Sequence, residues 1–115
     1  MSHRNGYSWK IEPMGEYPNS FTYARNGNGQ YLISIEVMSH DKFSVHIPEV
    51  DISSLYRSTF GQEPVGSMGG VLTGLTPLEI YLLLRKYNET RRTKIPIPDY
   101  FSSAGIEKTE VISVI

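Results

Sequence analysis

The chain has 115 residues, of which 12 are acidic, 11 are basic, three are His and none is Cys. This length predicts one domain over residues 1–115, and the hydrophobic (39%) and charged (20%) fractions are typical of a globular protein. The lack of Cys excludes a disulfide scaffold, a Cys-ligated zinc site and thiol catalysis. A formal net charge of -1 argues against attraction of the whole surface to nucleic acid or an acidic membrane.

The sequence predicts a protein without a membrane partner. Its longest strongly apolar run, residues 80–84, is far shorter than the ~20 residues that a membrane-spanning helix needs. The first six residues contain no apolar stretch of the kind found in secretory signals. We therefore expect a cytoplasmic location.

Four segments in the first half alternate apolar with polar residues, which predicts an antiparallel meander with one buried face. They cover residues 7–12, 20–24, 31–38 and 42–47. In the third segment Tyr31 is expected on the buried face, in the same row as Ile33 and Ile35. The Asn-Gly repeat at 26–29 is typical of a hairpin turn, and a three-residue loop at 39–41 would place Ile35 opposite Val45.

In the second half the apolar residues no longer alternate with polar ones as they do in the four predicted strands. Asp51 is expected to cap a short helix over 52–60, and a glycine-rich loop should follow over 61–75. Thr76 and Glu79 form a capping-box pattern that predicts a helix over 77–91. Residues 94–98 should be extended, and residues 109–115 should form a last strand. The predicted fold class is α+β, with the four-stranded N-terminal meander, a C-terminal strand and one main helix on one face of the sheet.

The main helix carries two apolar surfaces. The stripe of Ile80, Leu83, Leu84 and Tyr87 has the spacing of a core-facing side. The second surface is covered either by the 61–75 loop or the C-terminal strand, or by another copy of the chain or a protein partner. For a partner the contact residues would be Leu78, Tyr81, Leu82 and Arg85.

The basic end of this helix and the glycine-rich loop form a candidate ligand site. Either feature also has a plainer interpretation, a solvated helix end or a mobile loop, and the loop matches no P-loop or dinucleotide-binding pattern. If it binds, the ligand would be small, anionic and nucleotide-like, with Tyr87 and Tyr100 near enough for stacking. The candidate residues are Gly66, Ser67, Gly69, Gly70, Thr73, Arg91, Arg92 and Lys94.

Catalytic, metal and nucleic-acid motifs give weaker signals. The register above puts Ser34 opposite His46 and Glu36 opposite Ser44 on the polar face of the sheet. These residues include the Ser, His and Glu that a hydrolase site can combine. An open sheet face normally carries such residues, and no Gly-x-Ser-x-Gly motif is present. The three His lack metal-ligand spacing, no cofactor motif is found, and no motif for sequence-specific nucleic-acid recognition occurs.

These observations favour a non-enzymatic binding protein. Eight residues are Tyr, a type enriched where proteins meet partners, although Tyr also populates sheets. The leading hypothesis is a protein that acts stoichiometrically on a protein partner, as an inhibitor, immunity or adaptor protein does, or that self-associates. The alternative is a receptor or sequestering protein for the anionic ligand described above.

Overall fold

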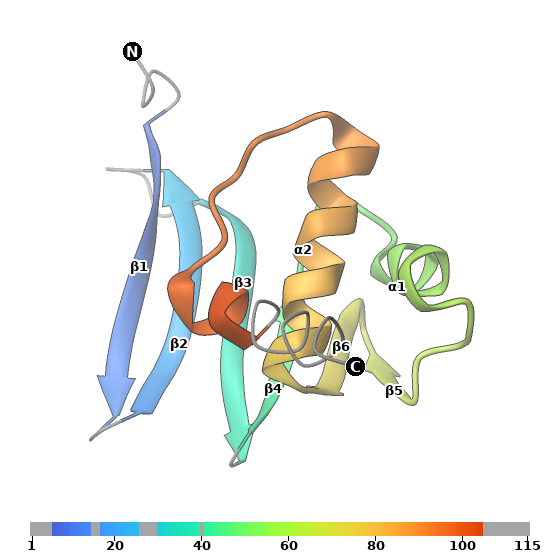
Figure 1. Cartoon of the computed structure of the whole chain (residues 1–115), viewed down its shortest axis with the longest axis horizontal. Helices are drawn as coiled ribbons and strands as arrows, with labels where there is room; N and C mark the ends of the chain where they lie inside the picture. The colour runs from blue at the N-terminus through green and yellow to red at the C-terminus, as the bar shows by residue number, and fades with distance from the viewer. Residues whose placement is uncertain (1–5, 15–16, 26–29, 40, 105–115) are drawn as a thin grey trace, which may run out of the picture.

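The computed structural model of the protein describes residues 6–14, 17–25, 30–39 and 41–104. Six strands form one antiparallel sheet in the order β1-β2-β3-β4-β6-β5 (Figure 1). The strands are β1 (Tyr7–Met14), β2 (Tyr17–Arg25), β3 (Tyr31–Ser39), β4 (Lys42–His46), β5 (Gly66–Met68) and β6 (Val71–Leu75), and the helices are α1 (Ile52–Phe60) and α2 (Pro77–Arg91). The fold is α+β as predicted, with a larger sheet than expected.

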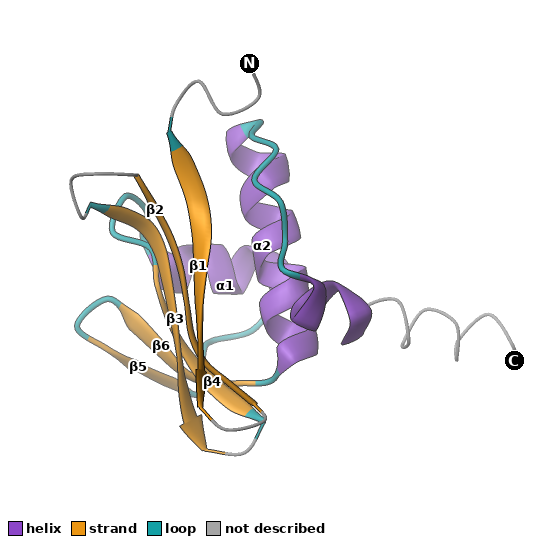
Figure 2. Ribbon diagram, turned by 90° about the vertical axis from the view of Figure 1, so that its left-hand side faces the viewer, coloured by secondary structure: helices purple, strands orange, loops and turns teal. Residues whose placement is uncertain are grey.

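The helices all lie on one side of the sheet, and in the described chain no helix covers the other face (Figure 2). The core between them contains Ile33, Ile35 and Val45 from the sheet, each with no exposed surface. The predicted stripe on α2 faces this core, and its four members are buried. The apolar face of the sheet, which follows from alternation in the strands, thus packs against the apolar stripe of α2, which follows from helical spacing.

Both helices begin at the predicted caps. The Asp51 side chain accepts a hydrogen bond from the Ser54 backbone N–H (3.2 Å), and α1 ends at Gly61 in the left-handed conformation. At α2 the Thr76 hydroxyl accepts from the Glu79 N–H (3.2 Å), while the Glu79 carboxylate accepts from the Thr76 N–H (2.8 Å). This reciprocal pair satisfies two N–H groups that a helix start leaves open, so α2 begins where the sequence predicted.

The prediction of a glycine-rich loop over 61–75 was wrong. Most of that segment is the β5–β6 hairpin, which joins the sheet beside β4. Met68 pairs with Val71, and Gly69 and Gly70 between them have φ of 59° and 82°. Two successive positive φ angles are what a tight two-residue hairpin turn requires, and glycine adopts them without steric cost.

Two bulges correct the predicted registers. Ile35 pairs with Val45 as expected, but Ser39 pairs with Lys42, so the connection is one residue shorter than the predicted 39–41 loop. A bulge between Val37 and Ser39 shifts the register by the one residue that this requires. A second bulge in β2–β3 pairs Ala24 with Tyr31. It reverses the alternation at the start of β3, as the contacts of Tyr31 show below.

Residues 92–98 cross from the end of α2 toward β1 and β2 (Figure 1). They form neither helix nor strand, and we call residues 93–98 the strap. Residues 99–104 are helical and insert Phe101, which has no exposed surface, against Phe21 at 4.5 Å between ring centroids. The strap is therefore fixed at both ends. The predicted turn at 26–29 and strand at 109–115 lie outside the described residues.

Candidate functional site

A groove of about 820 Å³ opens between the first strands, the C-terminal end of α2 and the strap. Its volume lies in the range of about 300–1,000 Å³ typical of small-molecule sites. We call it the aromatic groove; it is lined by Tyr7, Ser8, Trp9, Tyr23, Leu32, Glu49, Tyr87, Arg91, Thr93, Lys94, Ile95 and Pro96.

Three aromatic rings form the wall on β1 and β2. Tyr7 stacks on Tyr23 at 5.6 Å between centroids, and Trp9 meets Tyr23 at 5.1 Å. These rings come together because Trp9 pairs directly with Tyr23 across the two strands. Tyr7 and Trp9 are only half-buried, so flat, rigid aromatic surface borders the groove.

Leu32 completes this wall because of the β2–β3 bulge. Strict alternation would place Tyr31 on the core side, which was the prediction. The bulge instead turns Tyr31 to the opposite face, where its hydroxyl meets Nδ1 of His46 at 2.7 Å. Leu32 then lines the groove. The expectation that Tyr31 is buried was therefore wrong, and the cause is one extra residue in the strand.

The strap wall is held by one side chain of α2. The Asn88 carboxamide oxygen accepts hydrogen bonds from the Ile95 N–H (3.0 Å) and the Thr93 hydroxyl (2.7 Å), and its amide nitrogen donates to the Ile95 carbonyl (2.9 Å). At the far side the Trp9 indole N–H donates to the Pro96 carbonyl. The backbone that carries Lys94 is thus fixed between α2 and β1.

Two buried phenols reach the groove with unpaired hydroxyls. Tyr23 and Tyr87 are 6% and 2% exposed. Neither hydroxyl has a hydrogen-bond partner in the described chain, and neither is sealed from solvent. Burial raises the pKa of both phenols; Tyr7 adds to the effect at Tyr23, whereas at Tyr87 nearby Arg91 opposes it and Glu49 reinforces it. Both hydroxyls therefore stay protonated at neutral pH and can donate a hydrogen bond.

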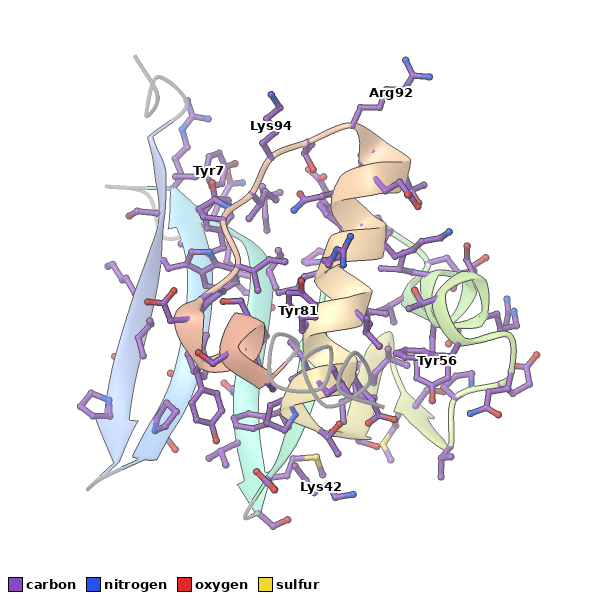
Figure 3. The ribbon with its side chains drawn as sticks, in the orientation of Figure 1. Tyr7, Lys42, Tyr56, Tyr81, Arg92 and Lys94 are labelled. Carbon is purple, nitrogen blue, oxygen red and sulfur yellow. The ribbon has the colours of Figure 1, made fainter. Side chains whose placement is uncertain are left out.

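Charges of both signs border the groove. The Arg91 guanidinium lies over the Tyr87 ring at 5.8 Å and contacts Glu49 at 3.6 Å between Nη2 and Oε1. Lys94 is exposed and forms no ion pair with a described residue. Arg92, which was predicted in the same site, lines no part of this groove and points away from the body of the protein (Figure 3).

The two halves of the predicted ligand site do not meet in this groove. Arg91 and Lys94 line it, but none of the residues Gly66, Ser67, Gly69, Gly70 and Thr73 does. The hairpin that contains them leads directly into the N-terminus of α2, whereas Arg91 is the last residue of that helix. Tyr100 also lies elsewhere and contacts Phe21, Phe43 and Phe101. The aromatic residues that line the groove together with Arg91 and Lys94 are Tyr7, Trp9, Tyr23 and Tyr87.

The predicted partner surface lies along one side of α2. Leu78 and Tyr81 are half-buried, and Tyr81 packs against the core, whereas Leu82 is 37% exposed. The Arg85 guanidinium lies over the Tyr81 ring at 5.6 Å. A hollow of about 280 Å³ beside them is lined by Thr59, Leu82, Arg85, Lys86 and Glu89.

The polar face of the sheet has the predicted pairing of Ser34 with His46 and of Glu36 with Ser44. No hydrogen bond in the described chain joins His46 to Glu36 or Ser34; His46 is engaged by Tyr31, and the Ser44 hydroxyl donates to the Glu36 backbone carbonyl (3.5 Å). Within the described ranges no group of His, Asp or Glu has the arrangement of a metal site, and no helix is long and apolar enough to cross a membrane.

Comparison of the chain with protein-family models, with curated proteins and with solved structures finds no match.

Proposed function

We propose that the protein binds a small anionic ligand with a planar aromatic part, a nucleotide-like molecule, in the aromatic groove. One observation carries this proposal. The half-exposed rings of Tyr7 and Trp9 and the cations of Arg91 and Lys94 line the same groove. Aromatic side chains offer stacking surface to a base, and a Lys or Arg beside them can pair with a phosphate.

The unpaired hydroxyls of Tyr23 and Tyr87 support the same proposal. Each hydroxyl is open to the groove and is not committed to a hydrogen bond within the described chain. Two phenols that are otherwise buried can therefore donate a hydrogen bond to a ligand in the groove. Ligand sites commonly combine a mostly apolar lining with a few such convergent polar groups.

Trp9 provides a direct test, since it is the single Trp of the chain and lines the groove. Titration with a panel of nucleotides should change its fluorescence and raise the melting temperature, because a ligand that binds only the folded state stabilises it. Lys94→Ala should weaken binding about tenfold, the equivalent of one charge-assisted hydrogen bond. Lys42→Ala, at the opposite end of the molecule (Figure 3), is the matched control and should bind like the unmodified protein. No response to any nucleotide at millimolar concentration would reject the proposal.

A protein partner on α2 is a second candidate, favoured by the exposure of Leu82 beside the stacked Tyr81–Arg85 pair. Such a partner would be bound stoichiometrically, as by an inhibitor or adaptor protein. Tyr and Arg side chains are typical anchors of protein interfaces. Leu82→Asp should abolish association with a captured partner while circular dichroism stays unchanged. Association that survives this substitution would exclude the surface.

A further inference from the structure

The wall of the aromatic groove contains a carboxylate, Glu49, which a purely anionic ligand would avoid. Its Oε1 oxygen lies 3.6 Å from Arg91 Nη2, and Oε2 has no hydrogen-bond partner in the described chain. The side chain is 51% exposed and lines the groove, and it also borders the neighbouring hollow beside α1. An ionised carboxylate has about four acceptor positions and no donor. The ligand must therefore present hydrogen-bond donors to this part of the groove.

Arg91 helps to hold the carboxylate in place. Its guanidinium is positioned by the Tyr87 ring at 5.8 Å, and its Nη2 lies 3.6 Å from Oε1 of the carboxylate. A contact of this kind between half-exposed side chains contributes little to stability. The Arg91–Glu49 contact leaves the carboxylate able to accept further hydrogen bonds. Because Arg91 partly compensates the negative charge of Glu49, a nearby phosphate is repelled less.

Among the common nucleobases, guanine fits this requirement best. Its Watson–Crick edge presents two adjacent donors, the N1–H and the 2-amino group, which match the two oxygens of a carboxylate. Adenine presents one amino group beside an acceptor nitrogen, and that nitrogen would face the carboxylate lone pairs. A site built around hydrogen bonds to a ligand discriminates strongly against an analogue that lacks the matching groups.

We propose that the aromatic groove is selective for a guanine mononucleotide, with Glu49 binding the donor edge of the base and Lys94 binding the phosphate. This inference rests on the proposed function, because it assigns the ligand of the same groove. It gives Glu49 and Lys94 separate tasks. Arg91, engaged by Glu49, positions the carboxylate, and Lys94, which has no ion-pair partner in the described chain, is available to the phosphate.

The test compares GMP, IMP, AMP and guanosine by isothermal titration and by Trp9 fluorescence. IMP keeps the N1–H but lacks the 2-amino group, and guanosine lacks the phosphate. GMP should bind about tenfold more tightly than IMP and still more tightly than AMP, since each lost charge-assisted hydrogen bond costs about a factor of ten. Glu49→Gln should remove most of the preference for GMP over AMP, because an amide both donates and accepts. Lys94→Ala should weaken GMP but leave guanosine unchanged.

The outcomes separate this inference from the proposal on which it rests. If GMP and AMP bind with equal affinity, or if Glu49→Gln weakens both by the same factor, guanine selectivity is wrong and nucleotide binding stands. If none of the four compounds binds to the folded protein but another nucleotide of the panel does, only the guanine assignment fails; if no nucleotide of the panel binds, both proposals fail. Circular dichroism of Glu49→Gln, compared with Lys42→Ala, checks that a change in affinity does not arise from unfolding.

Discussion

The indole N–H of Trp9 donates a hydrogen bond to the carbonyl oxygen of Pro96, 87 positions later in the chain. This bond ties an edge strand of the sheet to the strap that follows α2. Pro96 has no backbone N–H and the Pro ring restricts the residue before it, so the strap has few ways to pair with the sheet by backbone hydrogen bonds. The Trp9 side chain on β1 instead supplies the hydrogen bond that attaches the strap to the sheet, and Trp9 and Pro96 both line the aromatic groove.

Trp9→Phe should loosen the strap without disrupting the sheet. The ring still packs against Tyr23, but the donor to Pro96 is lost, and the exposed carbonyl can be hydrated by water. We expect the free energy of unfolding to fall by about 1 kcal/mol, measured by urea denaturation followed by circular dichroism. Hydrogen exchange at Ile95 and Ile97 should accelerate, with the core strand β3 unchanged. Unchanged exchange in the strap would show that this bond does not hold it.

Asn88 should matter more than Trp9, because it makes three hydrogen bonds to the strap. Asn88→Ala removes all three and leaves part-buried backbone groups of Ile95 without partners, so we expect a loss of about 2–3 kcal/mol in urea denaturation. Asn88→Asp keeps the two accepting bonds and loses the donor to the Ile95 carbonyl. Its loss should be intermediate. Equal losses for both variants would argue against the geometry given for this carboxamide.

The parts of the fold that could be predicted depend on neighbours in sequence. The α2 start rests on Thr76 and Glu79, three positions apart, and the β3–β4 pairing of Ile35 with Val45 rests on alternation about a short turn. The β5–β6 hairpin was missed because its strands are only three and five residues long and contain Gly66 and Gly74, a residue depleted in strands. The Gly69-Gly70 pair was the available hairpin signal.

The aromatic groove could be predicted only in part. Arg91, Lys94 and the nearby Tyr87 were recognisable from the basic end of a predicted helix. Tyr7, Trp9 and Tyr23 lie more than 60 positions away, and no local pattern relates them to that helix end. Leu32 faces the groove because of a bulge, and alternation alone predicts the opposite face. Glu49 lies in a connection between elements, where the sequence gives no register.

The β5–β6 hairpin requires a residue without a side chain at position 66, which is Gly66. A Cβ at residue 66 would collide with the Thr73 hydroxyl across the ladder. Gly66→Ala should therefore cost about 1–3 kcal/mol, as overpacking does. In a Thr73→Ala background most of that cost should disappear, because the colliding atom is gone. A double-mutant cycle in urea measures the difference. An equal cost in both backgrounds would place the strain elsewhere.

The two buried phenols of the aromatic groove should make stability fall at alkaline pH. Burial raises the pKa of Tyr23 and Tyr87 above the ordinary 10.0. As the pH rises through about 10, Tyr in the unfolded chain loses its proton while these two keep theirs. The unfolded state then binds fewer protons, so the free energy of unfolding decreases with pH. This contribution is fully present below about pH 10 and is lost as the pH rises toward the raised pKa values.

The double variant Tyr23→Phe/Tyr87→Phe should lose less stability than the unmodified protein between neutral pH and pH above 10, measured by urea denaturation at each pH. The same loss in both proteins would mean that other groups cause the alkaline unfolding.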